Sequence, residues 1–589
     1  MKCKKLSIIN YQLSIIIVLL LSSCSDFFDT DSSNVIFAEQ EHLDNATDSI
    51  YSLIGVLNKL QAIGDRTILF GEARGDLVDV TTSTPSDLRD LALFNVGDSN
   101  VYNSPRDYYA IINNCNYYID HVKKDLKNNR NEYIFLGEYA AIKAIRAWTY
   151  LQLVTTYGKV PFVTSPIMTK EDSERKYPVM GINEICEYFL DRDSLQSLAN
   201  VDYPYLGNIK SLPSRLFYIP MNIILGDLNL WAGRYMDAAK CYYTYITKRN
   251  GTNSSYPTDL DGTKWDNSTW SSITTSLLNS FLDETNVANS EIISIIPGDS
   301  IPSEGYYSQL RNIFNTNEDN GYKTSLTPSP SLIDLSASQV YCHYENKQFV
   351  YAPPSLTDYQ AGDLRLSSVW SSSENNIDKN GNKYTSHYIW KHSTRNIHIY
   401  RRQLVYLRLA EALNRAGYPA FAYAILSTGV NSQVLNYNVI PHYTKDSLVL
   451  AQFDFPSTRY GIYDPRNEFS TNSNTQGIHS RGCGYTPMNE YYLMPFDSTI
   501  TDSLALIQWQ IEKVEDMIVD EEALEFAFEG YRFYDLMRVA LRRGDTAYLA
   551  DRIYSRRGKS HTAEMKALIP RDLYNQENWF ISWNQQIGY

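Results

Sequence analysis

Cysteine is scarce in this chain, and the few that occur form no metal or redox motif. Only 7 of the 589 residues are Cys, and none belongs to a CxxC pair. Structural zinc sites and thioredoxin-like centres need such closely spaced thiols. The 9 His have no HExxH spacing, and neither a GxSxG turn nor a phosphate-binding glycine loop with Lys is present. The familiar signatures of metalloproteases, serine hydrolases and nucleotide-binding enzymes are therefore missing.

Basic charge is also in short supply. The chain has 53 Lys and Arg against 67 Asp and Glu, which gives a formal charge of −14, and it contains no basic block. Phosphate binding needs clustered Lys or Arg, so we expect no nucleic-acid partner. Hydrophobic residues make up 43% and charged residues 20% of the chain. This composition is typical of a globular protein with an ample core and excludes wholesale disorder.

No apolar run reaches the length of about 20 residues that a bilayer requires. A shorter run, residues 13–21 (LSIIIVLLL), follows a start with three Lys and precedes Ser-Ser-Cys24. A basic start, a short apolar core and small residues indicate a secretory signal peptide over residues 1–23. The Leu-Ser-Ser-Cys end resembles the bacterial lipobox, in which the Cys becomes the acylated first residue of the mature protein. The alternative is an ordinary cleavage site that happens to contain Cys.

Tyrosine is the residue in excess, with 47 Tyr against 21 Phe and 9 Trp. Tyr is amphipathic and suits hydrated contact surfaces, whereas Phe mainly fills cores. Long polar stretches rich in Asn, Ser, Gly and aromatic residues cover residues 250–272, 371–392 and 477–489. Within the second stretch, residues 378–382 (DKNGN) predict a hairpin turn. Large loops carried by a rigid scaffold are favoured places for binding sites.

Between the polar stretches the apolar spacing is helical. Ala141, Ala144, Trp148 and Leu151, for example, form one stripe with the period of an amphipathic helix. Two helix pairs, each joined by a turn that contains Gly, resemble tetratricopeptide units. Because the pairs lie far apart in the chain, we expect no uninterrupted repeat array. The stretches expected to be helical are residues 139–154, the pair 221–231 and 235–247, the pair 403–416 and 420–426, and residues 503–540.

Several short motifs in a fixed order carry a resemblance to a known family. The most recognisable is RAWTYLQLVTTYGKVP at residues 146–161, and EFAFEGYRFYDLMR at residues 525–538 is another. Behind the lipobox, these motifs resemble the SusD/RagB family of outer-membrane nutrient-binding lipoproteins. The chain departs from that family's usual Asn-Pro-Gly-Tyr ending only by closing on Gln-Ile-Gly-Tyr. The other motifs are residues 24–29 (CSDFFD), 71–76 (GEARGD) followed by 108–116, 362–365 (GDLR) and 407–414 (LRLAEALN).

The resemblance implies a fold and a function. The expected fold is mainly α, a helical superhelix with tetratricopeptide-like helix pairs on one side and a loop-rich ligand-binding face opposite. It would be a single SusD-like domain over residues 24–589, with an N-terminal part to about 330 and a C-terminal part from about 331. Family members are surface lipoproteins that form a hinged lid on a TonB-dependent outer-membrane barrel of the SusC type. They capture an oligomeric nutrient, usually a glycan and sometimes a peptide, and they are not enzymes and need no cofactor.

Three groups of aromatic and polar side chains are candidates for ligand contact. A sugar ring has an apolar face and a fringe of hydroxyls, so a flat aromatic ring beside amides or carboxylates is the expected binding chemistry. The alternative for each ring is burial in a small core of its own loop. The candidates are Tyr102 with Asn100 and Asn103, then Trp265 and Trp270 with Asp266 and Asn267, and finally Trp370, Tyr384, Tyr388 and Trp390.

Two sets of charged residues invite a catalytic interpretation instead. Asp76 and Asp79 lie in an acidic segment that resembles the carboxylate pair of a glycoside hydrolase. A surface hydrolase is therefore the alternative from a different functional class. The charged residues of the 525–538 motif lie three and four apart, so we expect them to form structural ion pairs with one another. An oligopeptide cargo remains the alternative within the lid function.

The lipobox prediction has a direct test. Replacing Cys24 with Ala removes the acylated thiol, so the protein should leave the membrane fraction and nutrient uptake should fall. Immunoblots of separated membrane and soluble fractions measure this, with Cys3→Ala inside the signal peptide as the control. Unchanged membrane retention of the Cys24→Ala protein would contradict the assignment.

Overall fold

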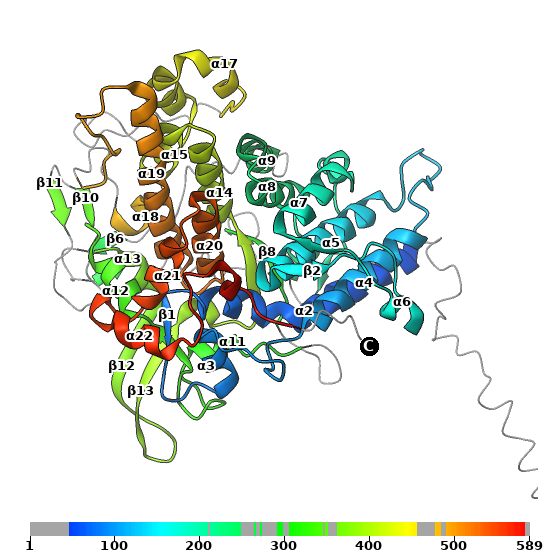
Figure 1. Ribbon diagram of the computed structural model, residues 1–589, viewed down its shortest axis with the longest axis horizontal. Coiled ribbons are helices and arrows are strands. Elements are labelled where there is room, and N and C mark those ends of the chain that lie inside the picture. The colour runs from blue at the N-terminus through cyan, green and yellow to red at the C-terminus, as the bar shows by residue number, and fades with distance from the viewer. Residues whose placement is uncertain are drawn as a thin grey trace, which may run out of the picture.

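In the computed structural model the chain is mainly helical, as the sequence predicts (Figure 1). The strands within the described residues form only two-stranded antiparallel ladders. Apolar residues from nearly all the long helices join one continuous core. The structure describes residues 46–209, 212–248, 264–266, 271–273, 291–298, 306–345, 348–351, 362–455, 477–484 and 491–583.

The long helices pack side by side as neighbours joined by turns and loops (Figure 1). Their apolar faces meet and form the core, which stabilises each helix far more than its intrinsic propensity does. They are α2 (Ala46–Glu72), α4 (Pro105–His121), α5 (Leu136–Tyr157), α7 (Ile182–Asp191), α8 (Met221–Trp231), α9 (Tyr235–Lys248), α14 (Arg402–Arg415), α15 (Pro419–Ser427), α19 (Ser503–Phe526) and α20 (Arg532–Arg543).

The helix contacts run in a continuous order from α4 through α5, α7, α8 and α9 to α14, and then to α15, α19 and α20. Helix α2 contacts α4, α5 and α20, so it joins the beginning and the end of this order. The two predicted tetratricopeptide-like pairs, α8/α9 and α14/α15, are distant in sequence, yet α9 packs directly on α14. The pairs are therefore spatial neighbours.

The helix boundaries expected from apolar spacing are confirmed to within a few residues, with two exceptions. The region 503–540 is not one helix, because the chain turns after Phe526 through Phe528 and Gly530, whose φ angles are 74° and 90°. Helix α2, with 27 residues, was not predicted. It contains glycines, which lower helix propensity. One of them, Gly64, permits close packing, since a Cβ there would lie 2.5 Å from the side chain of Ile397.

The short strands connect the helices and carry the loop-rich side of the molecule. The predicted hairpin is confirmed, with Asp378 Oδ1 accepting hydrogen bonds from the backbone N–H groups of Asn380 and Asn382, both 2.8 Å long. Figure 1 shows this hairpin projecting at the lower edge of the view, at the end opposite to α17 (Ser447–Leu450). The pairs are β1 (Val78–Val80) with β9 (Leu326–Pro328), β2 (Lys159–Pro161) with β3 (Val179–Gly181), β4 (Asn208–Ile209) with β5 (Leu212–Pro213), β6 (Lys264–Asp266) with β7 (Ser271–Ile273), β8 (Ile292–Ile296) with β14 (Ile397–Arg401), β10 (Cys342–Glu345) with β11 (Gln348–Tyr351), and β12 (Trp370–Ile377) with β13 (Lys383–Ile389).

The charged residues of the 525–538 motif form structural ion pairs, but mostly not with one another. Asp535 and Arg538 pair within α20 at 2.8 Å, as their spacing predicts. Arg532 instead binds Asp76, far away in the chain, at 2.6 Å. The expectation of pairing along the helix was wrong for most of the set because these side chains are buried. They therefore meet charges from other elements instead of neighbours on a solvated face.

Glu525 lies at the centre of a buried ion cluster. It bonds Arg401 at 2.6 Å, Arg365 at 2.9 Å and Arg481 at 3.1 Å. Burial alone would raise the pKa of Glu525, but the three arginines hold it well below its usual range. Removing one partner from such a buried set typically costs about 3–5 kcal/mol, because an uncompensated charge remains. We call this set the central ion cluster, and it comprises Glu291, Arg365, Lys391, Arg401, Arg481, Glu525 and Glu529.

Glu72, at the end of α2, is buried, and no cationic side chain of the described residues is bonded to its carboxylate. Its Oε1 accepts a hydrogen bond of 2.8 Å from the backbone N–H of Gly530. Burial is the largest influence and raises the pKa of Glu72 to about 7. Between about pH 4.5 and 7 the folded protein therefore holds a proton here that the unfolded chain has released. Stability from this group is present below pH 4.5 and is lost as the pH rises toward 7.

In the variant Glu72→Gln the amide does not titrate, so residue 72 no longer makes the free energy of unfolding fall as the pH rises. We expect the variant to be more stable at pH 8 by up to about 3 kcal/mol, with no advantage at pH 4. Urea unfolding followed by circular dichroism at several pH values measures the difference. Glu171→Gln, an exposed glutamate, is the matched control. An equal stability difference at pH 4 and pH 8 would contradict the assignment.

Candidate functional site

Half of the second predicted ligand group lies outside the described residues. Asn267 and Trp270 fall there, as does the predicted lipidation site Cys24. Trp265 and Asp266 belong to β6, whose backbone pairs with β7. Ligand contact by these four residues and acylation of Cys24 stay predictions.

The first predicted group forms one turn before α4. Asn100 is buried, its Nδ2 donates to the backbone oxygen of Asp87 at 2.9 Å, and its Oδ1 accepts from Tyr102 N at 3.0 Å. Asn103 Nδ2 donates to the backbone oxygen of Ser582 at 3.1 Å. Burial, as the main cause, raises the pKa of the half-buried Tyr102 to about 12. The amides of this group shape the turn and attach it to the C-terminal segment.

The third predicted group divides between the core and the surface. Trp370, at the start of β12, is buried in the main core. Tyr388 and Trp390 are 37% and 38% exposed, and their rings stack with centroids 5.6 Å apart and planes inclined by 21°. The structure therefore brings Tyr388 and Trp390 together as one exposed aromatic surface.

Polar side chains surround these two rings on the hairpin. Residues two apart on a strand share a face, so Tyr384 and Ser386 point to the same side as Tyr388. On β12, Ser371 is paired with Tyr388, and Asn376 donates to Ser386 Oγ at 3.1 Å. The ring of Tyr322 joins them, with its centroid 4.7 Å from that of Tyr384. We call this surface the aromatic hairpin face, and it comprises Tyr322, Ser371, Ser373, Asn376, Tyr384, Ser386, Tyr388 and Trp390.

Buried neighbours fix the position of the two exposed rings. Between them, Ile389 N donates to Asn315 Oδ1 at 2.6 Å. After them, Lys391 Nζ donates to the backbone oxygen of Glu525 at 2.8 Å, inside the central ion cluster. His392 follows, with its ring stacked on Phe314 at 4.6 Å. The stacked rings are thus held in place before any ligand arrives, which reduces the entropy lost on binding.

A further pair of exposed rings, Tyr306 and Tyr307, was missed in the sequence. Tyr306 donates from its hydroxyl to Asp65 at 3.2 Å, and the Arg395 guanidinium lies 3.5 Å from the centre of the Tyr307 ring. Arg395 also pairs with Asp319 at 3.6 Å, in the segment that leads to Tyr322. Their only sequence signal is a Tyr-Tyr pair in a polar stretch, which does not distinguish them from the many other Tyr.

The two carboxylates with a possible hydrolytic role are bound to arginines. Asp76 contacts Arg532 at 2.6 and 2.9 Å, and Asp79 contacts Arg557 at 2.6 Å. Burial would raise the pKa of Asp76, but Arg532 outweighs it and the pKa is lowered. A general acid in glycoside hydrolysis requires the opposite shift. Among the described residues, no three His, Cys, Asp or Glu side chains gather in a way that suits a metal ion.

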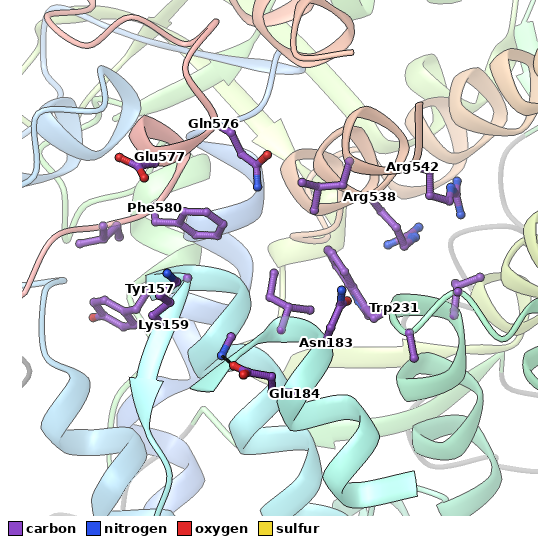
Figure 2. A pocket seen from close by; sticks show the side chains of 18 of the residues that line it. Tyr157, Lys159, Asn183, Glu184, Trp231, Arg538, Arg542, Gln576, Glu577 and Phe580 are labelled. Atoms are coloured by element: carbon purple, nitrogen blue, oxygen red, sulfur yellow. Dashed lines mark hydrogen bonds between the residues drawn. The ribbon is translucent and has the colours of Figure 1, made fainter. Parts of the chain in front are cut away.

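A cavity of about 1000 Å³ lies elsewhere, between α5, α7, α8, α20 and the C-terminal segment (Figure 2). None of the ligand-binding residues predicted from the sequence lines it.

The described helices include none that is both long and apolar enough to cross a membrane.

Comparisons with known proteins agree with this architecture. Residues 469–586 match the family model described as the SusD family, whereas no curated protein matches the chain. A SusD superfamily protein from Bacteroides vulgatus is 15% identical, with a TM-score of 0.56 over 92% of this chain and 96% of that one. A protein of the same organism described as sugar-binding is 17% identical, with a TM-score of 0.51 over 84% and 86%. A SusD superfamily protein from Bacteroides thetaiotaomicron is 15% identical, with a TM-score of 0.50 over 84% and 89%.

At such identities the solved structures establish the fold, while the family model adds sequence evidence over the C-terminal part. The resemblance seen in the sequence motifs is confirmed: residues 469–586 match the SusD family model, and the chain has a SusD-like, mainly helical fold.

Proposed function

We propose that the protein is a surface-exposed, lipid-anchored outer-membrane protein that binds an oligomeric glycan and acts as the lid of a TonB-dependent SusC-type transporter. In this proposal residues 24–589 are one SusD-like domain tethered through Cys24. The observation that carries glycan binding is the exposed, pre-positioned stack of Tyr388 and Trp390.

The chemistry of the aromatic hairpin face suits a glycan. Flat rings meet the apolar faces of sugars, while the hydroxyls of Ser371, Ser373 and Ser386 and the amide of Asn376 suit the hydroxyl fringe. Tyr384 and Tyr388 are four residues apart, roughly 13 Å along the strand. This length favours contact with more than one sugar ring, and hence an oligomer. The face carries no charged side chain, which favours a neutral glycan.

An oligopeptide cargo has less support at this hairpin. A peptide that adds as a strand needs a free strand edge. The outer edge of β13 is already used near its end, since the Thr316 backbone N–H donates to the His387 backbone oxygen and the His387 N–H donates to Thr316 Oγ1, both at 2.9 Å. We also propose that the protein is not an enzyme, because Asp76 and Asp79 are engaged by arginines.

Removing the stacked rings should weaken glycan binding. Each of Tyr388→Ala and Trp390→Ala should lower the affinity by roughly tenfold, because each removes one ring contact. Titration calorimetry of the soluble protein beginning at Ser25, against panels of oligosaccharides and of oligopeptides, measures this. Tyr437→Ala, at a tyrosine that is 76% exposed, is the matched control. Heat only with peptides, or glycan binding that both ring variants leave intact, would contradict the proposal.

The lid function predicts a stable complex with a large outer-membrane barrel. Affinity purification of the full chain from detergent-solubilised membranes should recover a TonB-dependent barrel in a fixed ratio. The Cys24→Ala protein, which lacks the anchor, tests how far the tether contributes. Recovery of the lipoprotein alone in mild detergent would contradict the lid function while leaving glycan binding intact.

A further inference from the structure

The cavity of about 1000 Å³ shares no residue with the aromatic hairpin face. Its walls come from the end of α5, the start of α7, the end of α8, one side of α20 and the C-terminal segment (Figure 2). This volume is at the upper end of the range of about 300–1000 Å³ that is usual for ligand pockets. The space is therefore large enough for a short oligosaccharide.

Two aromatic rings form opposite walls of this cavity. Figure 2 shows Phe580 on one side and Trp231 on the other. Phe580 packs directly on Gly158, where an added Cβ would lie 2.8 Å from the ring. The Arg538 guanidinium lies 5.5 Å from the centre of a Trp231 ring. Both rings are half-buried and line the cavity.

Of the charged side chains that line the cavity, all but Glu184 are paired with an opposite charge or balanced by one. Arg538 is bonded to Glu411 at 2.7 Å and to Asp535 at 2.8 Å. Arg542 is bonded to Glu515 at 2.7 Å. The Glu184 carboxylate accepts the Gly181 backbone N–H at 2.7 Å and thereby caps α7. The remaining charges, Lys159 and Glu577, are exposed and of opposite sign, so the lining keeps only the single charge of Glu184 and disfavours an anionic ligand.

The uncharged polar groups have capacity for a ligand. Asn183, in the first turn of α7, and Gln576, in the C-terminal segment, are exposed lining residues. Figure 2 shows the Gln576 amide directed into the space between the two rings and the Asn183 amide close to Trp231. Each amide offers an acceptor and two donors, which matches hydroxyl groups that both donate and accept. Two rings on opposite walls, with amides between and beside them, offer the apolar faces and the hydrogen-bonding groups that an uncharged pyranose requires.

We propose that this cavity is a second saccharide-binding site, which holds a short uncharged glycan between Trp231 and Phe580 with Asn183 and Gln576 bonded to its hydroxyls. This second site goes beyond the proposed function, because it lies on other elements than the hairpin. The evidence for it comes from the cavity and does not depend on the hairpin site. A protein with both sites binds two glycan segments at once. A short glycan then binds with a stoichiometry of two.

The test separates the two sites by removing the hairpin site first. The protein with Tyr388→Ala and Trp390→Ala combined is titrated calorimetrically with maltose, cellobiose, lactose, mannobiose and chitobiose. We expect it to bind at least one of these disaccharides with a stoichiometry of one. Adding Asn183→Ala or Trp231→Ala should weaken that binding by roughly tenfold. Asn436→Ala, at an exposed amide, and Trp509→Ala, at a half-buried Trp in α19, are the matched controls.

The outcomes are distinct. Asn183 is exposed, so its variant retains the fold and decides the result even where Trp231→Ala lowers thermal stability. Absence of heat with every disaccharide, binding that both cavity variants leave unchanged, or heat only with a tripeptide panel overturns the second site. None of these results depends on the hairpin. Conversely, a disaccharide stoichiometry that is the same in the hairpin double variant as in the natural protein overturns the hairpin site and leaves the cavity site supported.

Discussion

The pairing of Glu525 with three buried arginines is the interaction on which the arrangement of the molecule depends. Arg365, Arg401 and Arg481 come from elements widely separated along the chain, and each is at most 3% exposed at its side chain. Taking so many charges out of water is costly unless every one is paired. The cluster therefore admits only the arrangement in which α13 (Leu364–Val369), β14 and α18 (Ser480–Cys483) all meet α19. It attaches the loop-rich side of the molecule to the helical side.

The same cluster determines where the exposed rings lie. Lys391 inserts its ammonium between Glu529 and the backbone oxygens of Glu525 and Ala527. Trp390, its immediate neighbour, is thereby held at the root of a hairpin that otherwise projects from the body. A strand pair without further support is marginal in water. A rigid contact surface at this place thus follows from electrostatic pairing in the core, and a mutation far from the ligand would still disturb it.

Local patterns predicted what depends on near neighbours. Apolar spacing located α8 from Met221 to Trp231, and the Asp-Lys-Asn-Gly-Asn turn located the hairpin. The same reasoning did not separate Trp370 from Trp390, since it did not give the strand register, which places Trp370 opposite the buried Ile389. Local patterns also could not predict pairing between charges that are distant in sequence. Helical spacing tells on which side of a helix a residue lies, but not which residue of another element it meets. The cavity was invisible for a similar reason, as its lining comes from separate elements.

The distribution of charge connects these observations. The chain is acidic overall, yet many of the arginines and carboxylates of the described residues lie in buried pairs such as Arg532 with Asp76 and Arg538 with Glu411. Buried pairs contribute little net stability compared with apolar packing, but they strongly disfavour alternative arrangements in which one partner is left alone. Because these charged side chains pair with one another in the core, aromatic rings, amides and hydroxyls are the main groups available for ligand contact on the two proposed binding surfaces. Such surfaces discriminate by shape and hydrogen bonding, not by ligand charge, which is the selectivity that a receptor for neutral glycans requires.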